Sequence, residues 1–474
     1  MALADTNIAA QRSLAERLVA IVLDHPANRI SEAAIQATVL CMQDTIGVAL
    51  ASAAMGVAGA GAVLALTERA CDSAVVWGTG RGATSHDAAL ANGMLAHGID
   101  FDDTHPAAIM HASAVNVPVA LALGEALQKR PRDIIAAAAL GYEVSARLGR
   151  LAPGRFLERG FQSSAVLGVF AATCIAARLS EASVGTTVQA MGIAGSMASG
   201  LMEYLSDGSD VKQMQPGWAA HCGIRALALA QAGLTGPRTV IEGRYGIFRS
   251  FAGLEIDSDI VLHPITERFE VEDMAPKPYP ACMCIHPIVQ AILDLRERGI
   301  LSLDSVESIA EIRCEVPEWY VGLIFEPADT KRGPRNAYEG RFSAPFAIAR
   351  TILDGQLDVK SFAIEKLSDP RMSDIARKVT YQARPFQEFP ESFPALVRVR
   401  FADGSVSESF VPHNLGSRGL PLGASGVEAK FRDNIALGIA RPDADRLQQA
   451  ITSFHHAQDA HQLWQALRKA TVQH

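Results

Sequence analysis

The hydrophobic periodicity of the chain changes twice, and this constrains the fold more than any other feature. From about residue 12 to 261 the apolar residues keep the spacing of helices. Within 266–412 apolar and charged residues alternate with a period of two. The pair Asp403-Gly404 joins two such runs and predicts a hairpin turn. Helical spacing returns after Pro421.

These changes predict a fold that is mainly α with an α+β second domain. We expect an all-helical large domain built from both chain ends, 1–265 and 413–474. A smaller α+β domain with an antiparallel sheet is expected over 266–412. The length of 474 residues also favours two domains over a single core. A cleft between the domains is then the expected ligand site.

Charge and composition exclude several classes of protein. The formal charge of -8 argues against nucleic-acid binding, which needs a basic face. The uncharged stretch 45–67 is long enough to span a bilayer, but it is rich in Ala and Gly. It therefore predicts two buried helices broken at Met55-Gly56, and no membrane span. The N-terminus lacks a basic and an apolar signal region, so we expect a cytoplasmic protein with free thiols.

Residues 97–118 hold the densest group of titratable side chains. Three carboxylates and three imidazoles lie there, and the flanking chain is almost bare of charge. Because buried charges are costly unless they are paired, this group predicts an anion-binding or proton-transfer site. His111 is the candidate acid or base, with Asp100, Asp103 and Thr104 beside it. The alternative interpretation is a solvated Asp-rich loop that caps the next helix.

Two other segments supply positive charge. Lys212 precedes an Ala-rich helix, and Lys277 opens a Lys-Pro-Tyr-Pro segment where the pattern changes. Lys212 suits capture of an anion, although a solvated surface side chain is the alternative for it. Lys277, beside an interdomain hinge, suits a segment that faces the substrate. The Cys-x-Cys-x-His run from Cys282 to His286 has no second Cys/His pair at zinc spacing, so no metal is predicted. The glycine-rich run 77–82 lacks the Rossmann and Walker patterns.

The order of these motifs resembles that of the MmgE/PrpD family. The resemblance extends from about residue 12 to 440. It rests on Trp77-Gly-Thr-Gly, Asn92-Gly93, His97, Asp100-Phe-Asp-Asp-Thr104, His111, Pro118, Gly160-Phe161, Gly168, Lys212, Pro216-Gly217, Ala219-Ala220-His221, Lys277-Pro-Tyr-Pro, Cys282, His286 and Phe342-Ser343. It implies a helical domain from both termini, an α+β lid and a homodimer. It also implies chemistry without a cofactor on a small anionic di- or tricarboxylate.

The resemblance further implies which residues form the site. The catalytic set carried over onto this chain consists of His111, Asp100, Lys212, Lys277 and Tyr320. The expected substrate-binding residues are Thr104, Asp103, Gln162, Ser163, Cys282 and His286.

Two positions depart from the family pattern. Gln162 stands where many members have a histidine, and a glutamine cannot transfer a proton. Cys282 stands where the decarboxylating members have a histidine. Both departures count against decarboxylation of cis-aconitate and leave dehydration and epimerisation open.

The leading hypothesis is a carbon-oxygen lyase that dehydrates a 2-methylcitrate-like hydroxy acid. His111, oriented by Asp100, would remove the proton α to a carboxylate, and Lys212 and Lys277 would stabilise the enediolate. The first alternative is an epimerase or isomerase of the iminodisuccinate epimerase type, with Tyr320 or a lysine as second acid. A cis-aconitate-type decarboxylase and a non-catalytic carboxylate-binding protein are the remaining alternatives.

Overall fold

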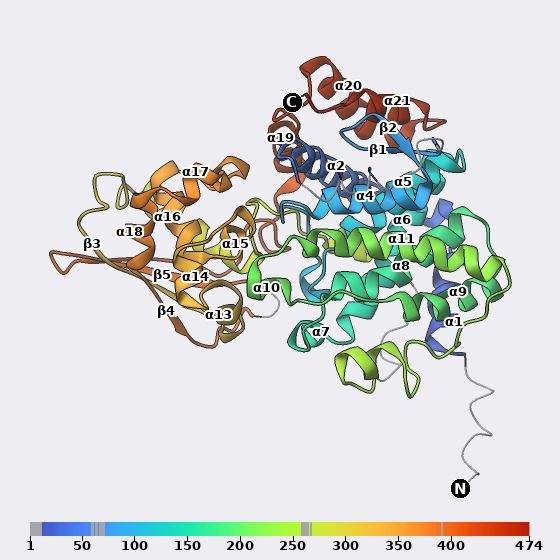
Figure 1. Ribbon diagram of the computed structural model, residues 1–474, viewed down its shortest axis with the longest axis horizontal. Helices are drawn as coiled ribbons and strands as arrows, with labels where there is room; N and C mark the ends of the chain where they lie inside the picture. Colours follow the sequence, from blue (N-terminus) through green and yellow to red (C-terminus); the bar gives the residue numbers. More distant parts are fainter. Residues whose placement is uncertain are drawn as a thin grey trace, which may run out of the picture.

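The computed structural model describes residues 12–57, 61, 65, 72–256, 265, 268–389 and 392–473. Figure 1 shows a large helical body and, beside it along the longest axis, a smaller domain that contains a sheet. Each of the two has its own hydrophobic core. The predicted fold class, mainly α with an α+β second domain, is confirmed.

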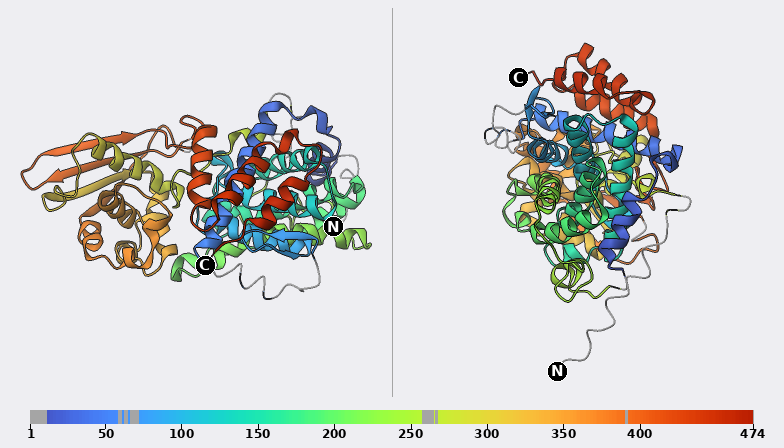
Figure 2. Two further views of the ribbon diagram at one scale, coloured as in Figure 1. Left: turned by 90° about the horizontal axis from the view of Figure 1, so that it is seen from above. Right: turned by 90° about the vertical axis from the view of Figure 1, so that its right-hand side faces the viewer.

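The helical body takes its elements from both ends of the chain. In the first part they are α1 (Leu14–Leu23), α2 (Glu32–Ala54), α4 (Ser85–His97), α5 (Ser113–Ala126), α6 (Pro131–Arg150), α7 (Arg155–Glu158), α8 (Ser163–Leu179), α9 (Val184–Met197), α10 (Tyr204–Asp207) and α11 (Val211–Gln231). In the C-terminal part they are α19 (Gly423–Ile435), α20 (Arg441–Thr452) and α21 (His461–Lys469). Figure 2 shows the C-terminal helices, in red, lying across the first part.

Helix α19 packs on α2 where these two parts of the chain meet. A Cβ at Gly47 would lie 2.7 Å from Cδ2 of Phe431, so the glycine lets the two helices approach. Phe431 is fully buried there and belongs to the same core as the N-terminal helices. The return of the chain therefore completes the core of the helical body.

The helical body also contains a small hairpin, which corrects the expectation of an all-helical domain. Strands β1 (Ala74–Val76) and β2 (Arg81–Ala83) pair in antiparallel fashion. Gly78 and Gly80 adopt φ values of 77° and 65° in the turn, a region that favours glycine. The glycine-rich run 77–82 thus forms the turn of this hairpin and the start of β2.

The α+β domain contains a four-stranded sheet in the order β4-β3-β5-β6. Its strands are β3 (Ile309–Val316), β4 (Val379–Ala383), β5 (Ala395–Phe401) and β6 (Val406–Val411). Its helices are α12 (His286–Glu297), α13 (Glu318–Ile324), α14 (Ala328–Arg332), α15 (Ala337–Arg341), α16 (Ala344–Asp354), α17 (Ile364–Leu367) and α18 (Pro370–Arg377). The predicted hairpin at Asp403-Gly404 joins β5 to β6.

The sheet is mixed, whereas the alternation had predicted an antiparallel one. β3 pairs with β5 in antiparallel register, but Ile312 to Val316 pair in parallel with Val379 to Ala383 of β4. Helices α13 to α18 lie between β3 and β4 in the chain. A connection of that length allows a crossover, which a parallel pair requires.

One helix of the described chain, α2, is long and apolar enough to cross a membrane by length and composition. Inside the protein 72% of its apolar window is buried, as expected for a core helix. The predicted break is present, since Met55 caps α2 and Gly56 has a φ of 67°. The second helix predicted before residue 67 falls mostly outside the described residues.

Candidate active site

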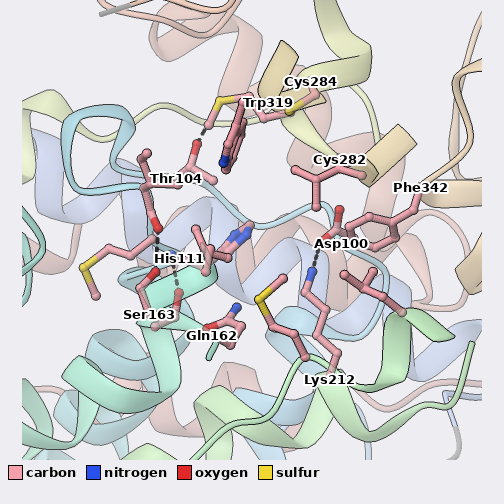
Figure 3. A pocket seen from close by; sticks show the side chains of 18 of the residues that line it. Asp100, Thr104, His111, Gln162, Ser163, Lys212, Cys282, Cys284, Trp319 and Phe342 are labelled. Atoms are coloured by element: carbon pink, nitrogen blue, oxygen red, sulfur yellow. Dashed lines mark hydrogen bonds and ion pairs between the residues drawn. The ribbon is translucent and has the colours of Figure 1, made fainter. Parts of the chain in front are cut away.

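A cavity lies where the α+β domain meets the helical body. The helical body contributes the loop between α4 and α5, the start of α8, the segment around α10 and the first turn of α11. The α+β domain contributes the segment from Lys277 to Cys284, helix α13, Phe342 and Phe393. Figure 3 shows His111 and Lys212 projecting into this cavity from the helical body, with Trp319 and Cys282 on the other side.

Asp100 binds two lysines from different parts of the chain. It adopts a left-handed backbone conformation with a φ of 51°, three residues after the end of α4 at His97. Its carboxylate forms an ion pair with Lys212, and Lys277 Nζ lies 3.1 Å from Oδ2 and donates to the Asp100 carbonyl at 2.8 Å. Burial would raise the pKa of Asp100, but the two ammonium groups hold it well below its usual value. Two lysines and one carboxylate therefore carry a net positive charge at the cavity.

His111 belongs to a buried cluster with His97 and Asp102. Oδ2 of Asp102 lies 2.8 Å from Nδ1 of His97 and 3.2 Å from Nδ1 of His111. His111 Nδ1 is also 3.1 Å from the carbonyl oxygen of Asp103. Because both neighbours of this nitrogen are acceptors, we assign the proton of a neutral His111 to Nδ1. Nε2 is then the basic nitrogen.

The environment of the cluster favours neutral His97 and ionised Asp102. Burial lowers the pKa of His97 to about 4, although Asp102 opposes the shift. Burial also acts to raise the pKa of Asp102, but the two imidazoles bring it well below its usual value. Of the two histidines, His111 lines the cavity. Asp102 therefore orients the His111 ring from the side that faces away from the cavity. The sequence had predicted Asp100 in this role, and the structure corrects that prediction.

Asp103 faces away from the cavity into the helical body. Its Oδ2 accepts a hydrogen bond from Ser113 at 2.5 Å, and the Ser113 hydroxyl lies 2.6 Å from the Tyr142 hydroxyl. Burial and the nearby Asp44 raise the pKa of Asp103 to about 8. The structure therefore places Asp103 behind the site, apart from the other predicted substrate-binding residues.

Three predicted polar residues do line the cavity, and each also makes a structural hydrogen bond. Thr104 donates to the sulfur of Met283 at 3.2 Å, and Ser163 donates to the carbonyl of Ile109 at 2.6 Å. Gln162 caps α8, because its Oε1 accepts from the backbone N–H of residue 165 at 3.1 Å. Its amide nitrogen remains available as a donor to a ligand (Figure 3).

Of the site residues predicted in the α+β domain segment after Lys277, Cys282 lines the cavity, whereas His286 and Tyr320 do not. Cys282 lines the cavity together with Cys284, and the hydrogen bond between the thiols lowers the pKa of Cys282. His286 lies behind the wall, 3.1 Å from the carbonyl of residue 281, and burial lowers its pKa to about 3. Tyr320 is fully buried against Phe393 in the domain core, and its neighbour Trp319 lines the cavity. This placement differs from the prediction of a lid tyrosine at the substrate.

Two groups within the described chain bring metal-ligating atoms together. The first is His97, Asp102 and His111, and the second is His105, Glu270 and Asp273. In the first group both imidazoles hydrogen-bond to the same carboxylate oxygen, so that a metal would have to replace these bonds. In the second group the carboxylates pair with arginines. Neither arrangement calls for a metal to satisfy its charges.

Two parts of the site were missed by reasoning from the sequence. The pairing of His97 with Asp102 could have been suspected, because a helix end and the following loop place them five residues apart. Lys430 lay far away in the chain and carried no local signal. Its ammonium donates to the carbonyl of Phe101 at 2.7 Å and pairs with Asp44 at 2.6 Å, so α19 supports the loop from behind.

Comparison with known proteins places the chain in a family. It matches the model of the MmgE/PrpD N-terminal domain over residues 16–257 and that of the MmgE/PrpD C-terminal domain over residues 279–456. It is 26% identical to cis-aconitate decarboxylase of Mus musculus over 402 residues, which cover 81% of this chain and 79% of the relative. For cis-aconitate decarboxylase of Homo sapiens the identity is 28% over 390 residues, 78% and 77% of the two chains. The protein of the same name from Aspergillus terreus is 27% identical over 352 residues, 69% and 70% of the two. The chain belongs to the MmgE/PrpD family.

Proposed function

We propose that this protein is a lyase that removes a proton α to a carboxylate of a small di- or tricarboxylate, without a cofactor. The reaction that we propose first is dehydration of a 2-methylcitrate-like hydroxy acid. One observation carries the proposal: a histidine with a free basic nitrogen and a pair of lysines line the same cavity. Family membership and relatives that act on a carboxylic acid support this class of enzyme.

The first step is removal of the α proton by Nε2 of His111. Asp102 and the carbonyl of Asp103 hold the other ring nitrogen, so they fix the orientation of the ring and stabilise the imidazolium that forms. General base catalysis of this kind contributes about 10²–10⁴-fold to the rate.

The negative charge that develops on the substrate carboxylate is stabilised by Lys212 and Lys277. Asp100 holds both ammonium groups in place before substrate arrives, so little reorganisation is needed in the transition state. Removing one fixed donor of this type costs about 10²–10³-fold in kcat.

The second step breaks the bond between the β carbon and its hydroxyl oxygen. The leaving oxygen takes the proton back from the His111 imidazolium and departs as water, while the electron pair of the former C–H bond forms the alkene. The products are one unsaturated acid and one water molecule, and His111 returns to its neutral form.

The test is an NMR assay of the purified protein with a chelator present, against 2-methylcitrate, citrate, cis-aconitate and iminodisuccinate. An alkene formed from a hydroxy acid supports dehydration. Recovered substrate of inverted configuration would instead assign an epimerase. Absence of any reaction with all four acids would contradict the proposal in this form.

Decarboxylation is the second candidate, because three relatives are named as cis-aconitate decarboxylases. It would use the same lysine pair to stabilise the carbanion left by carbon dioxide. The same assay tests it, since loss of carbon dioxide from cis-aconitate gives a distinct product. The positions of Gln162 and Cys282 in the cavity count against it, because neither supplies an imidazole there.

A further inference from the structure

The cavity holds few fixed positive charges. Among the described residues that line it, the cationic side chains are Lys212 and Lys277, and both contact Asp100. With Asp100 ionised, the two ammonium groups and the carboxylate together carry a net charge of about +1. The site can therefore neutralise about one substrate carboxylate.

The buried Arg341 attracts Asp100 through its charge but offers no direct contact to a ligand in the cavity. Arg341 donates to the carbonyl of Pro280 at 2.7 Å, and its guanidinium lies 4.4 Å from the centre of the Phe362 ring. Arg341 does not line the cavity. A second or third carboxylate would thus meet only neutral donors, such as the Gln162 amide.

Beyond Lys277 and the two cysteines, the part of the cavity formed by the α+β domain is apolar. Trp319 and Leu323 project from one face of α13, and Phe342 and Phe393 complete this surface, which we call the apolar wall. Figure 3 shows Trp319 and Phe342 on the same side of the cavity as Cys282. A wall of this composition excludes water and favours an uncharged group.

The apolar wall is held in place by Lys331. Its buried ammonium donates to the carbonyls of Leu323 at 2.7 Å and Phe342 at 2.9 Å. The Phe342 ring lies 4.8 Å from the ammonium of Lys212, so the wall begins where the cationic subsite ends. The two subsites are therefore adjacent, and their spacing is fixed by the fold.

We propose that the substrate of this site is a carboxylate with an apolar substituent, which packs against Trp319, Leu323, Phe342 and Phe393 while one carboxylate binds Lys212 and Lys277. The inference rests on the proposed function and narrows its substrate class. It sets this chain apart from an enzyme for an unsubstituted tricarboxylate, because the apolar wall offers no cation to a further carboxylate.

Binding of three unreactive acids to the wild-type protein tests this, measured by calorimetry. Phenylsuccinate has two carboxylates and an apolar arm, succinate has the carboxylates alone, and tricarballylate has a third carboxylate. We expect phenylsuccinate to bind at least about tenfold more tightly than succinate. We expect tricarballylate to bind no more tightly than succinate, and tightest binding of tricarballylate would overturn the inference.

Two variants test whether the apolar wall causes the difference in affinity between the three acids. Trp319→Ala should remove most of the preference for phenylsuccinate over succinate. Leu323→Arg should add a cation and make tricarballylate bind at least about tenfold more tightly. Trp218→Ala is the matched control, because Trp218 stacks on His221 of α11 outside the cavity. An unchanged preference in both Trp319→Ala and Leu323→Arg would overturn the inference.

The binding measurements and the NMR assay can fail independently of each other. If phenylsuccinate binds as expected but no acid is converted in the NMR assay, the apolar subsite stands and the lyase proposal fails. If a tricarboxylate without an apolar substituent, such as citrate, is converted and tricarballylate binds most tightly of the three unreactive acids, the lyase proposal stands and the apolar subsite fails.

Discussion

The carboxylates of Asp100, Asp102 and Asp103 lie within four residues of chain but face three different environments. Asp100 binds two lysines, Asp102 binds two histidines, and Asp103 turns into the core toward Ser113. The sequence predicted that such a group could not be ionised uniformly. It could not show which carboxylate meets which partner, because the partners come from distant helices.

Replacement of His111 by Asn tests the assignment of the base. The amide can still donate a hydrogen bond toward Asp102, but it cannot accept a proton from the substrate. We expect kcat to fall by about 10²–10⁴-fold with little change in stability. His413→Asn is the control, because this histidine is exposed just after β6 and does not line the cavity. Comparable turnover of His111→Asn and wild type would remove His111 from the mechanism.

Replacement of Asp103 by Asn tests the protonation of the buried carboxyl. The folded protein keeps this proton up to about pH 8, whereas the unfolded chain releases it near pH 4. Between these values the folded state binds more protons, so this group makes stability fall as pH rises. Asparagine is permanently neutral, and we expect it to raise the free energy of unfolding at pH 7 by about 1–3 kcal/mol.

Urea unfolding of wild type and Asp103→Asn at several values between pH 5 and 8 makes the comparison. The two curves should converge toward the acid end. A difference that does not change with pH would mean that Asp103 is ionised in the folded protein.

At the scale of elements, helix α19 ties the end of the chain to the site. Lys430 donates to the carbonyl of Phe101 and pairs with Asp44 of α2. Both partners are buried, and burial raises the pKa of Asp44 and lowers that of Lys430 despite their attraction. The pair therefore adds little net stability, but leaving one partner alone is costly.

The variant Lys430→Met is expected to lose about 3–5 kcal/mol of stability, because Asp44 is left buried without its partner. Adding Asp44→Asn removes the second charge and should recover most of that loss. The four members of this cycle can be compared by urea unfolding. Equal destabilisation by the single and the double variant would contradict a coupled pair.

Much of the element order could be predicted from periodicity. The turn at Asp403-Gly404 was predictable because that dipeptide favours a hairpin. The parallel pairing of β3 with β4 was not, since alternation gives the faces of a strand but not its neighbours. The sequence also could not show that Trp319 lines the cavity and Tyr320 does not. Neighbouring residues on a helix point in different directions, so an error of one residue changes which side chain faces the cavity.

At the scale of the molecule, the site exists only because two domains meet. The helical body supplies His111 and Lys212, and the α+β domain supplies Lys277 and the apolar wall. The cleft between the domains was predictable from the two changes in periodicity. Its apolar side was not, since Trp319, Phe342 and Phe393 come from separate segments. The homodimer stays a prediction, which sedimentation of the purified protein can test.

The most direct test of the account is solvent exchange at the α carbon. Wild type and His111→Asn are incubated in D₂O with a chelator and the four acids of the panel, and the entry of deuterium is followed by NMR. The account predicts α-deuteration or alkene formation with wild type, at least about 100-fold slower in the variant. Equal rates in the two proteins, or exchange only after a metal is added, would contradict it.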